Sequence, residues 1–347
     1  MASTAAARHG SGTSVSQRIA QAGTFSVEFP HLLANHLPMV LHALHALGAE
    51  DDRLATYFAT YRDANGLVAV PPPVAPIDDG NWRDHLGERA READYRSFFA
   101  GEVRRLGQRG ALAAWLPALV PGIAASALHS LMRLAYAALR GDSDETAIGL
   151  AYLCCAYLPL RPAGDAPSQT ADPADVLARM RDIDAFQRVE SPSHLLWHWM
   201  RATADLPEFA PVVDWLDVRG DGLARVAAAS LRLMAATMTF EAVHAVTGAH
   251  WVRLVRGNGC DDPMLRYFWQ AVASVYPKIG MPPLPDEAAF EAMRRLPCPG
   301  WPEIAAAACA SDDEHDLSYA FSAREEQRVY GDRLYQVTAA RRLGLIP

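Results

Sequence analysis

Positive charge is scarce in this sequence, and lysine is almost absent from it. Lys278 is the single lysine among 347 residues, and 40 acidic residues outnumber 32 basic ones, so the net charge is −8. Because nucleic-acid binding requires a basic surface, we expect no nucleic-acid partner. The N-terminal residues contain no apolar core of signal-peptide length, and no stretch of transmembrane length is free of charge. We therefore expect a cytoplasmic protein that does not bind a membrane.

The motifs of several common enzyme classes are also missing. The sequence has no G-x-G-x-x-G after a strand, no G-x-x-x-x-G-K-[ST] and no G-x-S-x-G, so neither a nucleotide site nor a hydrolase elbow is indicated. Its five cysteines include no C-x-x-C pair, which excludes a zinc ribbon and a disulfide framework. Redox chemistry would therefore depend on a metal, or on a cofactor that leaves no such motif.

Strand patterns are sparse, and helical patterns take their place. Half of the residues are hydrophobic and 21% are charged, which is enough for a large core. We predict an all-α fold, a single large multi-helix, bundle-like domain that possibly has two pseudo-halves. Residues 1–14 are predicted to be a flexible arm and 15–347 the helical domain, with a weak internal boundary near 161–175. The clearest predicted helices are 36–47, 121–141, 223–256 and 312–343.

The predicted helix 121–141 is apolar almost all the way round, yet it carries His129, Arg133 and Tyr136 on one face. Burying a cation and an imidazole on such a helix is costly unless a partner compensates them. Two interpretations stay open at this point. Arg133 could form a structural ion pair with a carboxylate inside the bundle, or it could be a catalytic cation that holds an anionic substrate beside a metal-bound His129.

Four histidines lie in helical, mostly apolar surroundings: His36, His129, His244 and His315. A lone buried histidine is more often a core residue than a ligand, but bundle cores build metal sites from side chains on facing helices. Imidazole suits iron, copper, zinc and nickel alike. Glu241 and Asp312 each precede one of these histidines by three residues, but a di-iron site needs further buried carboxylates that we do not find. The pairs His42/His45 and His194/His198 have metal-compatible spacing that is common by chance, and HExxH is absent.

The segments around these four histidines carry a family resemblance. NHLPM, PGIAASALHSLMRLAYA, FEAVHAVTGAHWVRL and DDEH each contain one of them, and together the chain resembles the questin oxidase-like family of fungal and bacterial proteins. The family includes oxidases that open the quinone ring of anthraquinones in aromatic polyketide biosynthesis. Some are described as NADPH-dependent and Baeyer–Villiger-like, and at least one resembling protein is a non-haem iron dioxygenase with four histidines and a carboxylated lysine.

The resemblance implies iron bound by His36, His129, His244 and His315. Members commonly have a lysine three residues after the last histidine, where this chain has Ser318, and Lys278 lies in a different segment. A water or an Asp or Glu ligand would replace the lysine, or the site would hold four histidines alone. The identity of the metal stays open.

The leading functional prediction is a secondary-metabolism oxygenase, a dioxygenase-type enzyme that uses Fe(II) and O2 on a small aromatic, polyketide-like substrate. Tyr136, Trp197 and Trp251 would contact this substrate, Trp199 would help to line its pocket, and Arg133 would balance the charge of an enolate or superoxide. Carboxylates such as Asp313 or Glu241 could fix the histidine tautomers. The alternatives are a metal-free, NADPH-dependent Baeyer–Villiger-type oxidase and a non-catalytic helical ligand-binding protein. We assign no oligomeric state from the sequence.

Overall fold

The computed structural model describes residues 14–347, and in this part of the chain the predicted all-α fold is confirmed. Sixteen α-helices make up most of it, with 66% of the chain helical. The one sheet among the described residues pairs β1 (Glu28–Phe29) with β2 (Leu33–Ala34) in antiparallel register. The predicted flexible arm falls almost wholly on residues 1–13, which lie outside the described residues.

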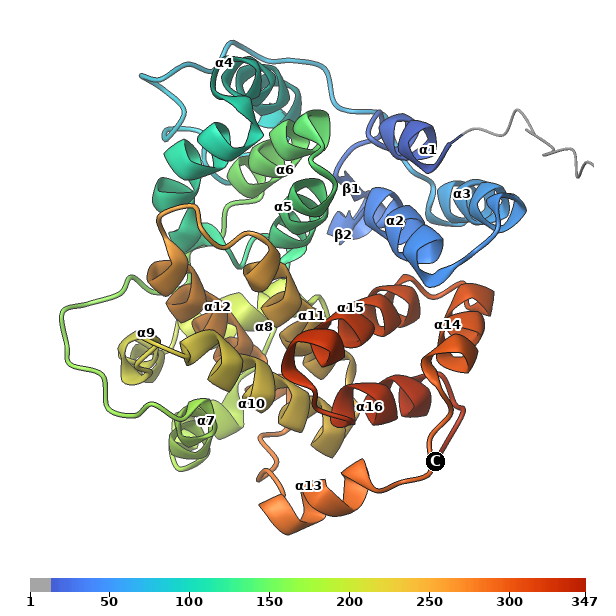
Figure 1. Cartoon of the computed structure of the whole chain (residues 1–347). Helices are drawn as coiled ribbons and strands as arrows, with labels where there is room; N and C mark the ends of the chain where they lie inside the picture. Colours follow the sequence, from blue (N-terminus) through green and yellow to red (C-terminus); the bar gives the residue numbers. More distant parts are fainter. Residues whose placement is uncertain (1–13) are drawn as a thin grey trace, which may run out of the picture.

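The first half of the chain folds into six helices, which occupy the upper part of Figure 1. They are α1 (Val15–Ala22), α2 (Leu37–Leu47), α3 (Asp51–Asn65), α4 (Glu92–Leu119), α5 (His129–Arg140) and α6 (Ser143–Cys155). The predicted helix 36–47 is observed as α2, which ends at Gly48 with the left-handed φ of 100° that favours glycine.

The second half contributes ten helices. They are α7 (Pro173–Arg181), α8 (Leu196–Ala204), α9 (Val212–Trp215), α10 (Gly222–Thr237), α11 (Phe240–Leu254), α12 (Asp261–Val275), α13 (Glu287–Arg294), α14 (Trp301–Ala310), α15 (Glu314–Tyr330) and α16 (Leu334–Arg342). No helix within residues 14–347 is both long and apolar enough to cross a membrane.

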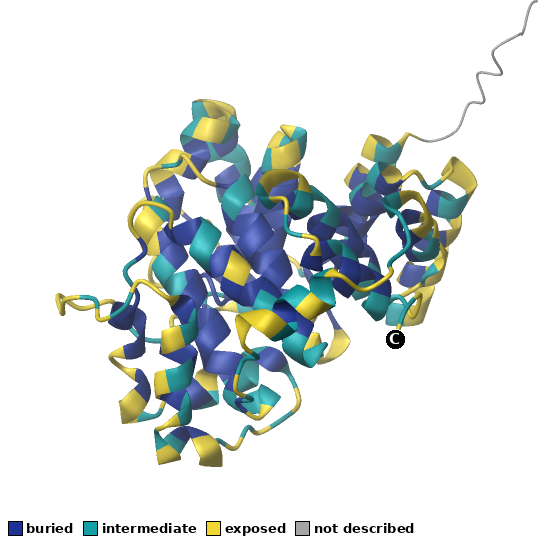
Figure 2. Cartoon of the chain, turned by 60° about the horizontal axis from the view of Figure 1, so that its bottom comes forward, coloured by how far each residue is buried: buried dark blue, intermediate teal, exposed yellow. Residues whose placement is uncertain are grey.

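Four of these helices form the centre of the molecule. Helix α5 packs against α11, α11 against α15, α15 against α2, and α2 against α5, so that the four close a ring. The other helices surround this centre, with α6 on α5 and α4 on α6, and α10 on α11 (Figure 1). Buried residues accordingly gather on the inward faces of the helices (Figure 2).

Three predicted helices are shorter than expected. The predicted helix 121–141 begins only at His129, because Ser126, Ala127 and Leu128 all have positive φ values, of 48°, 55° and 73°. The prediction 223–256 was wrong in joining α10 to α11, which are separated at Met238, with Thr239 capping the second helix through its side chain. The prediction 312–343 likewise divides at Gly331, which has a φ of 73°.

The proposed internal boundary at 161–175 is a segment without regular structure for most of its length. Its backbone is hydrogen-bonded to side chains of the second half of the chain. Gly164 N–H donates to the carboxylate of Asp214, and Ala163 N–H donates to Tyr267 Oη. The buried apolar residues on both sides of the segment form one continuous hydrophobic core, which runs from Ile19 to Ala340 in the sequence.

Candidate functional site

The four predicted histidines come together where the N-terminal ends of the four central helices meet. His36 is the N-cap of α2, His129 is the first residue of α5, His315 is the second residue of α15, and His244 lies in the second turn of α11. The order of the histidines around the site, 36–129–244–315, is the order in which the helices pack. The packing of the central helices therefore positions all four side chains.

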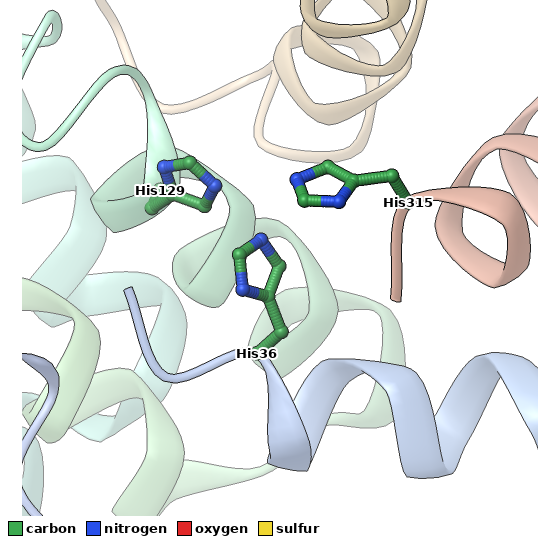
Figure 3. A group of neighbouring side chains, drawn as sticks. All are labelled: His36, His129 and His315. Atoms are coloured by element: carbon green, nitrogen blue, oxygen red, sulfur yellow. The ribbon is translucent and has the colours of Figure 1, made fainter. Parts of the chain in front are cut away.

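The imidazole rings form a closed quadrilateral. Neighbouring ring centroids lie 4.5 Å apart for His36 and His129, 5.4 Å for His129 and His244, 5.6 Å for His244 and His315, and 5.1 Å for His315 and His36. One nitrogen from each of His36, His129 and His315 lies within 4.8 Å of the other two. These three side chains turn a ring nitrogen toward a common space (Figure 3).

Every Nδ1 atom in this ring has a hydrogen-bond partner on the protein. His36 Nδ1 is 2.9 Å from Ala34 O, His244 Nδ1 is 3.0 Å from Phe240 O, and His129 Nδ1 bonds to Ser126 O. His315 Nδ1 is 3.1 Å from an oxygen of Asp313. Because each of these acceptors takes a proton from Nδ1, the Nε2 atoms of the four rings are left for a ligand, and Nε2 in its unprotonated form is the atom that binds a metal.

The left-handed turn before α5 has a direct role in this arrangement. Consecutive residues with positive φ are uncommon outside glycine and cost conformational energy. Here they direct the carbonyl of Ser126 at His129 Nδ1, and they place Ser126 and Ala127 on the wall of the pocket. His129 Nε2 is left buried without a partner among the described residues. An unsatisfied buried nitrogen is costly unless a ligand meets it.

Burial lowers the pKa values of three of the four histidines. Desolvation is the main cause that lowers the pKa of His129 to about 4. Desolvation, followed by the charge of His129, also lowers the pKa values of His36 and His244 well below the ordinary value for histidine. At neutral pH these three side chains are therefore uncharged bases, which need lose no proton to coordinate a cation.

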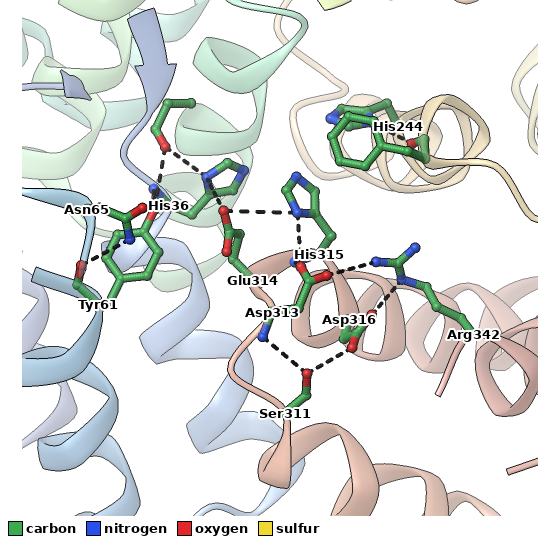
Figure 4. A network of polar contacts seen from close by, with 12 residues as sticks. His36, Tyr61, Asn65, His244, Ser311, Asp313, Glu314, His315, Asp316 and Arg342 are labelled. Carbon is green, nitrogen blue, oxygen red and sulfur yellow. Dashed lines mark hydrogen bonds and ion pairs between the residues drawn. The ribbon is translucent and has the colours of Figure 1, made fainter. Parts of the chain in front are cut away.

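One carboxylate in the surrounding network contacts a histidine of the ring directly. Asp313 accepts from both the backbone N–H and Nδ1 of His315, and these bonds hold the pKa of its carboxyl at about 2. Arg342 lies 3.4 Å from the other oxygen of Asp313 and 2.8 Å from Asp316 (Figure 4). The prediction that Asp313 fixes a histidine tautomer agrees with this geometry, whereas Glu241 instead pairs with Lys278.

Asp313→Asn is expected to weaken metal binding by about 10-fold or more, because outer partners of ligating histidines set ring orientation and basicity. Asparagine keeps an oxygen that can cap α15, so the free energy of unfolding should change by less than about 1 kcal/mol. Competition with a chromophoric chelator measures the affinity, and urea unfolding measures the stability. An unchanged metal affinity would contradict the role assigned to Asp313.

The ring of histidines lies at an apolar pocket of about 250 Å³. Its walls are mostly hydrophobic and aromatic side chains from the β1–β2 hairpin and from the starts of α8 and α11, namely Phe29, Leu32, Leu33, Leu195, Leu196, Trp197 and Phe240. His194, Asn65 and Glu314 add polar groups. Trp197, which was predicted to contact a substrate, lines this pocket, and the guanidinium of Arg89 lies over its ring at 5.1 Å.

Arg133 does not reach the pocket, which corrects the placement expected for a catalytic cation. It is completely buried and forms a bidentate ion pair with Glu145, in which Nε and Nη2 each lie 2.9 Å from a carboxylate oxygen. The structure therefore shows the structural ion pair, which was the other interpretation of Arg133 that the sequence left open. Since α5 starts at His129, the residue one turn later points deeper into the bundle and away from the pocket.

The other two predicted substrate contacts, Tyr136 and Trp251, are also placed in the core, and Trp199 does not line the pocket either. Tyr136 packs edge-on against His42 with ring centroids 5.6 Å apart, and burial raises the pKa of its hydroxyl. Tyr136 lies two helical turns after His129, and Trp251 lies two turns after His244, which is about 10 Å along the helix axis in both cases. Sharing a helix face with His129 or His244 therefore did not bring Tyr136 or Trp251 to the depth of the pocket.

Ser318, at the position of the lysine that the resemblance implies, is buried and does not line the pocket. Its hydroxyl faces Tyr136 and partly offsets the effect of burial on the tyrosine pKa. Lys278 is held by Glu241 outside the pocket. Within residues 14–347, no lysine is therefore placed to join the histidines.

Several residues of the pocket were missed by the sequence analysis. Glu314 directly precedes His315, and Phe240 precedes His244 by one turn, so a search for neighbours of the four histidines could have found both. Asn65 gives no such signal, because it ends α3 and reaches the pocket only through tertiary packing.

The donor set fits a metal ion. Imidazole nitrogens suit iron, cobalt, nickel, copper or zinc, and the partnerless Nε2 of His129 is a buried atom that such an ion would satisfy. The site thus defines a class: an all-imidazole centre at the convergence of four helices, beside an apolar aromatic pocket. Its Nδ1 atoms are all committed to the protein, as in known metal–histidine sites.

The family follows from comparison of the whole chain with known proteins. The family model described as questin oxidase-like matches residues 33–319, so the chain belongs to the questin oxidase-like family. A comparison with curated proteins finds no match. Membership implies an oxidoreductase of the oxygenase type, and the family suggests an anthraquinone-type substrate.

Proposed function

We propose that this protein is a non-haem iron oxygenase that opens a ring of an anthraquinone-like or related polyketide substrate by cleaving a carbon–carbon bond with O2. The observation that carries the proposal is the quadrilateral of His36, His129, His244 and His315, with every Nδ1 bonded to the protein and each Nε2 left for a ligand. When bound, ferrous iron would supply the ability to react with O2, which organic substrates alone do slowly.

The protein's own side chains would provide binding and orientation. Trp197, Phe240 and Phe29 offer aromatic surfaces against which a flat ring system can pack beside the histidines. The low polarity of these walls would exclude water and so protect reactive oxygen species and intermediates from side reactions. Four imidazoles bring no charge to the metal, so the nearby carboxylates Asp313 and Glu314 would supply the balancing negative charge.

Elemental analysis of the purified protein tests the proposal first. We expect close to one iron per chain after anaerobic loading with Fe(II), and uptake of O2 when anthraquinones are added. The protein should need no NADPH for single-turnover product formation. Zinc as the only metal that binds, or oxidation of NADPH by metal-free protein together with product, would overturn the iron-oxygenase assignment.

A further inference from the structure

The side chains that line the pocket beside the histidine ring include a negative charge but no arginine or lysine. Glu314 is the one carboxylate among its lining residues, and neither an arginine nor a lysine lines it. The remaining polar side chains of the lining, apart from the four histidines of the ring, are Asn65, Ser126 and His194. The charged side chains of the lining therefore offer a ligand negative charge and no fixed cation.

The carboxylate of Glu314 has no hydrogen-bond donor among the described residues. Two imidazoles lie at ion-pair distance from it, with Oε1 3.9 Å from His36 Nδ1 and 4.0 Å from His315 Nδ1. Both distances exceed a hydrogen bond, because each Nδ1–H already donates elsewhere, to Ala34 O and to Asp313. Figure 4 shows Glu314 between these two rings. Its side chain is 24% exposed, so a ligand in the pocket can reach the free oxygens.

Asn65 is left with an acceptor as well. One Nδ2–H donates to Tyr61 O over 3.0 Å, which fixes the amide orientation and leaves Oδ1, like the second Nδ2–H, without a hydrogen bond among the described residues. Asn65 and Glu314 both line the pocket, from the end of α3 and the start of α15. Two acceptors in a site whose walls are mostly apolar are complementary to a ligand that brings hydrogen-bond donors.

We propose that Glu314 is the specificity-determining residue of this pocket, and that its carboxylate accepts the hydrogen bond of a substrate hydroxyl. The inference rests on the proposed function in that it concerns the same pocket, and it names the residue that recognises a hydroxyl of the substrate. A bonded hydroxyl satisfies the carboxylate, whereas a methyl ether leaves it unpaired, and an aromatic carboxylate meets like charge. A site with buried acceptors rejects ligands that lack the donor more strongly than it rejects a small change in size.

Equilibrium binding of three matched probes tests this. The probes are 2-hydroxyanthraquinone, 2-methoxyanthraquinone and anthraquinone-2-carboxylate, and quenching of tryptophan fluorescence gives each dissociation constant at a pH where the free phenol is protonated. The wild-type protein should bind the phenol at least about 10-fold more tightly than the ether, because hydrogen bonds to charged groups are the strong ones. The carboxylate should bind most weakly.

Three variants assign the preference to the residue. Glu314→Leu should reduce the phenol-to-ether ratio to less than about 2-fold, and Glu314→Gln, which keeps an acceptor without charge, should leave an intermediate ratio. Asp312→Leu is the matched control, since Asp312 is an exposed carboxylate on the same segment that does not line the pocket, and its ratio should stay at the wild-type value.

Metal content is measured on the same samples, so the two proposals fail separately. A Glu314-dependent phenol preference in protein that binds no iron would sustain this inference and overturn the iron oxygenase. Equal binding of phenol and ether by the wild-type protein, or a ratio unchanged in Glu314→Leu, overturns the inference whatever the metal content.

Discussion

His129→Ala should abolish stoichiometric metal retention while leaving the helical content of the protein nearly unchanged. The imidazole is one of four, but it shares a centroid distance of 4.5 Å with His36 and 5.4 Å with His244, and its buried Nε2 has no other partner. Loss of one donor from a four-imidazole set removes a coordinate bond and opens the site to water, so iron should fall well below one equivalent after dialysis. Elemental analysis and far-ultraviolet circular dichroism measure the two quantities.

His198→Ala is the control for this experiment. His198 lies on α8, where Nδ1 bonds to Ser193 Oγ, and it does not line the pocket. The variant should retain the wild-type amount of metal. Stoichiometric metal in His129→Ala would show that the ring is not the binding site, and the proposed function would then lose its main support.

Arg133→Met is expected to destabilise the protein by about 3–5 kcal/mol, the usual result of removing one partner from a buried ion pair. The side chains of Arg133 and Glu145 are 0% and 4% exposed, and two hydrogen bonds join them between α5 and α6. The substitution would leave the carboxylate of Glu145 buried without its cation. Urea unfolding followed by circular dichroism measures the loss.

The double variant Arg133→Met/Glu145→Gln separates a structural role from a catalytic one. Removing the buried negative charge as well should recover a large part of the lost stability, because the penalty comes from the unpaired carboxylate. Metal content and binding of 2-hydroxyanthraquinone should match the wild-type values in this protein. A double variant that is stable, retains metal and yet binds the probe much more weakly would restore Arg133 to the site.

The helical nature of the fold could be predicted from the sequence. The sequence also singled out the four histidines that line the pocket. Sparse β-branched residues and long apolar stretches favour helices whatever their packing, and α2 ends at Gly48, as its glycine predicts. The histidines were found because each stands in a segment that resembles the family. The sequence could not show that they form one ring, because their meeting depends on how helices from distant parts of the chain pack.

The errors at the site have a common physical cause. Periodicity gives the face of a helix that a side chain occupies, but it does not give the depth at which that side chain lies. Arg133 and Tyr136 share a face with His129, yet the pocket opens only at the start of α5. That start is set by the left-handed residues 126–128, none of which is a glycine, so nothing in the local sequence marks the break.

The ring of histidines joins parts of the chain that are far apart, since His36 and His315 come from its two ends and His129 and His244 from between them. Contacts of such long sequence separation form late in folding, after most loop-closure entropy has been lost. A nascent chain consequently lacks the site until α15, the last helix that carries one of the four histidines, is made and docked. Incomplete chains would thus lack the complete ring of histidines, so that any chemistry of the site would be confined to finished molecules.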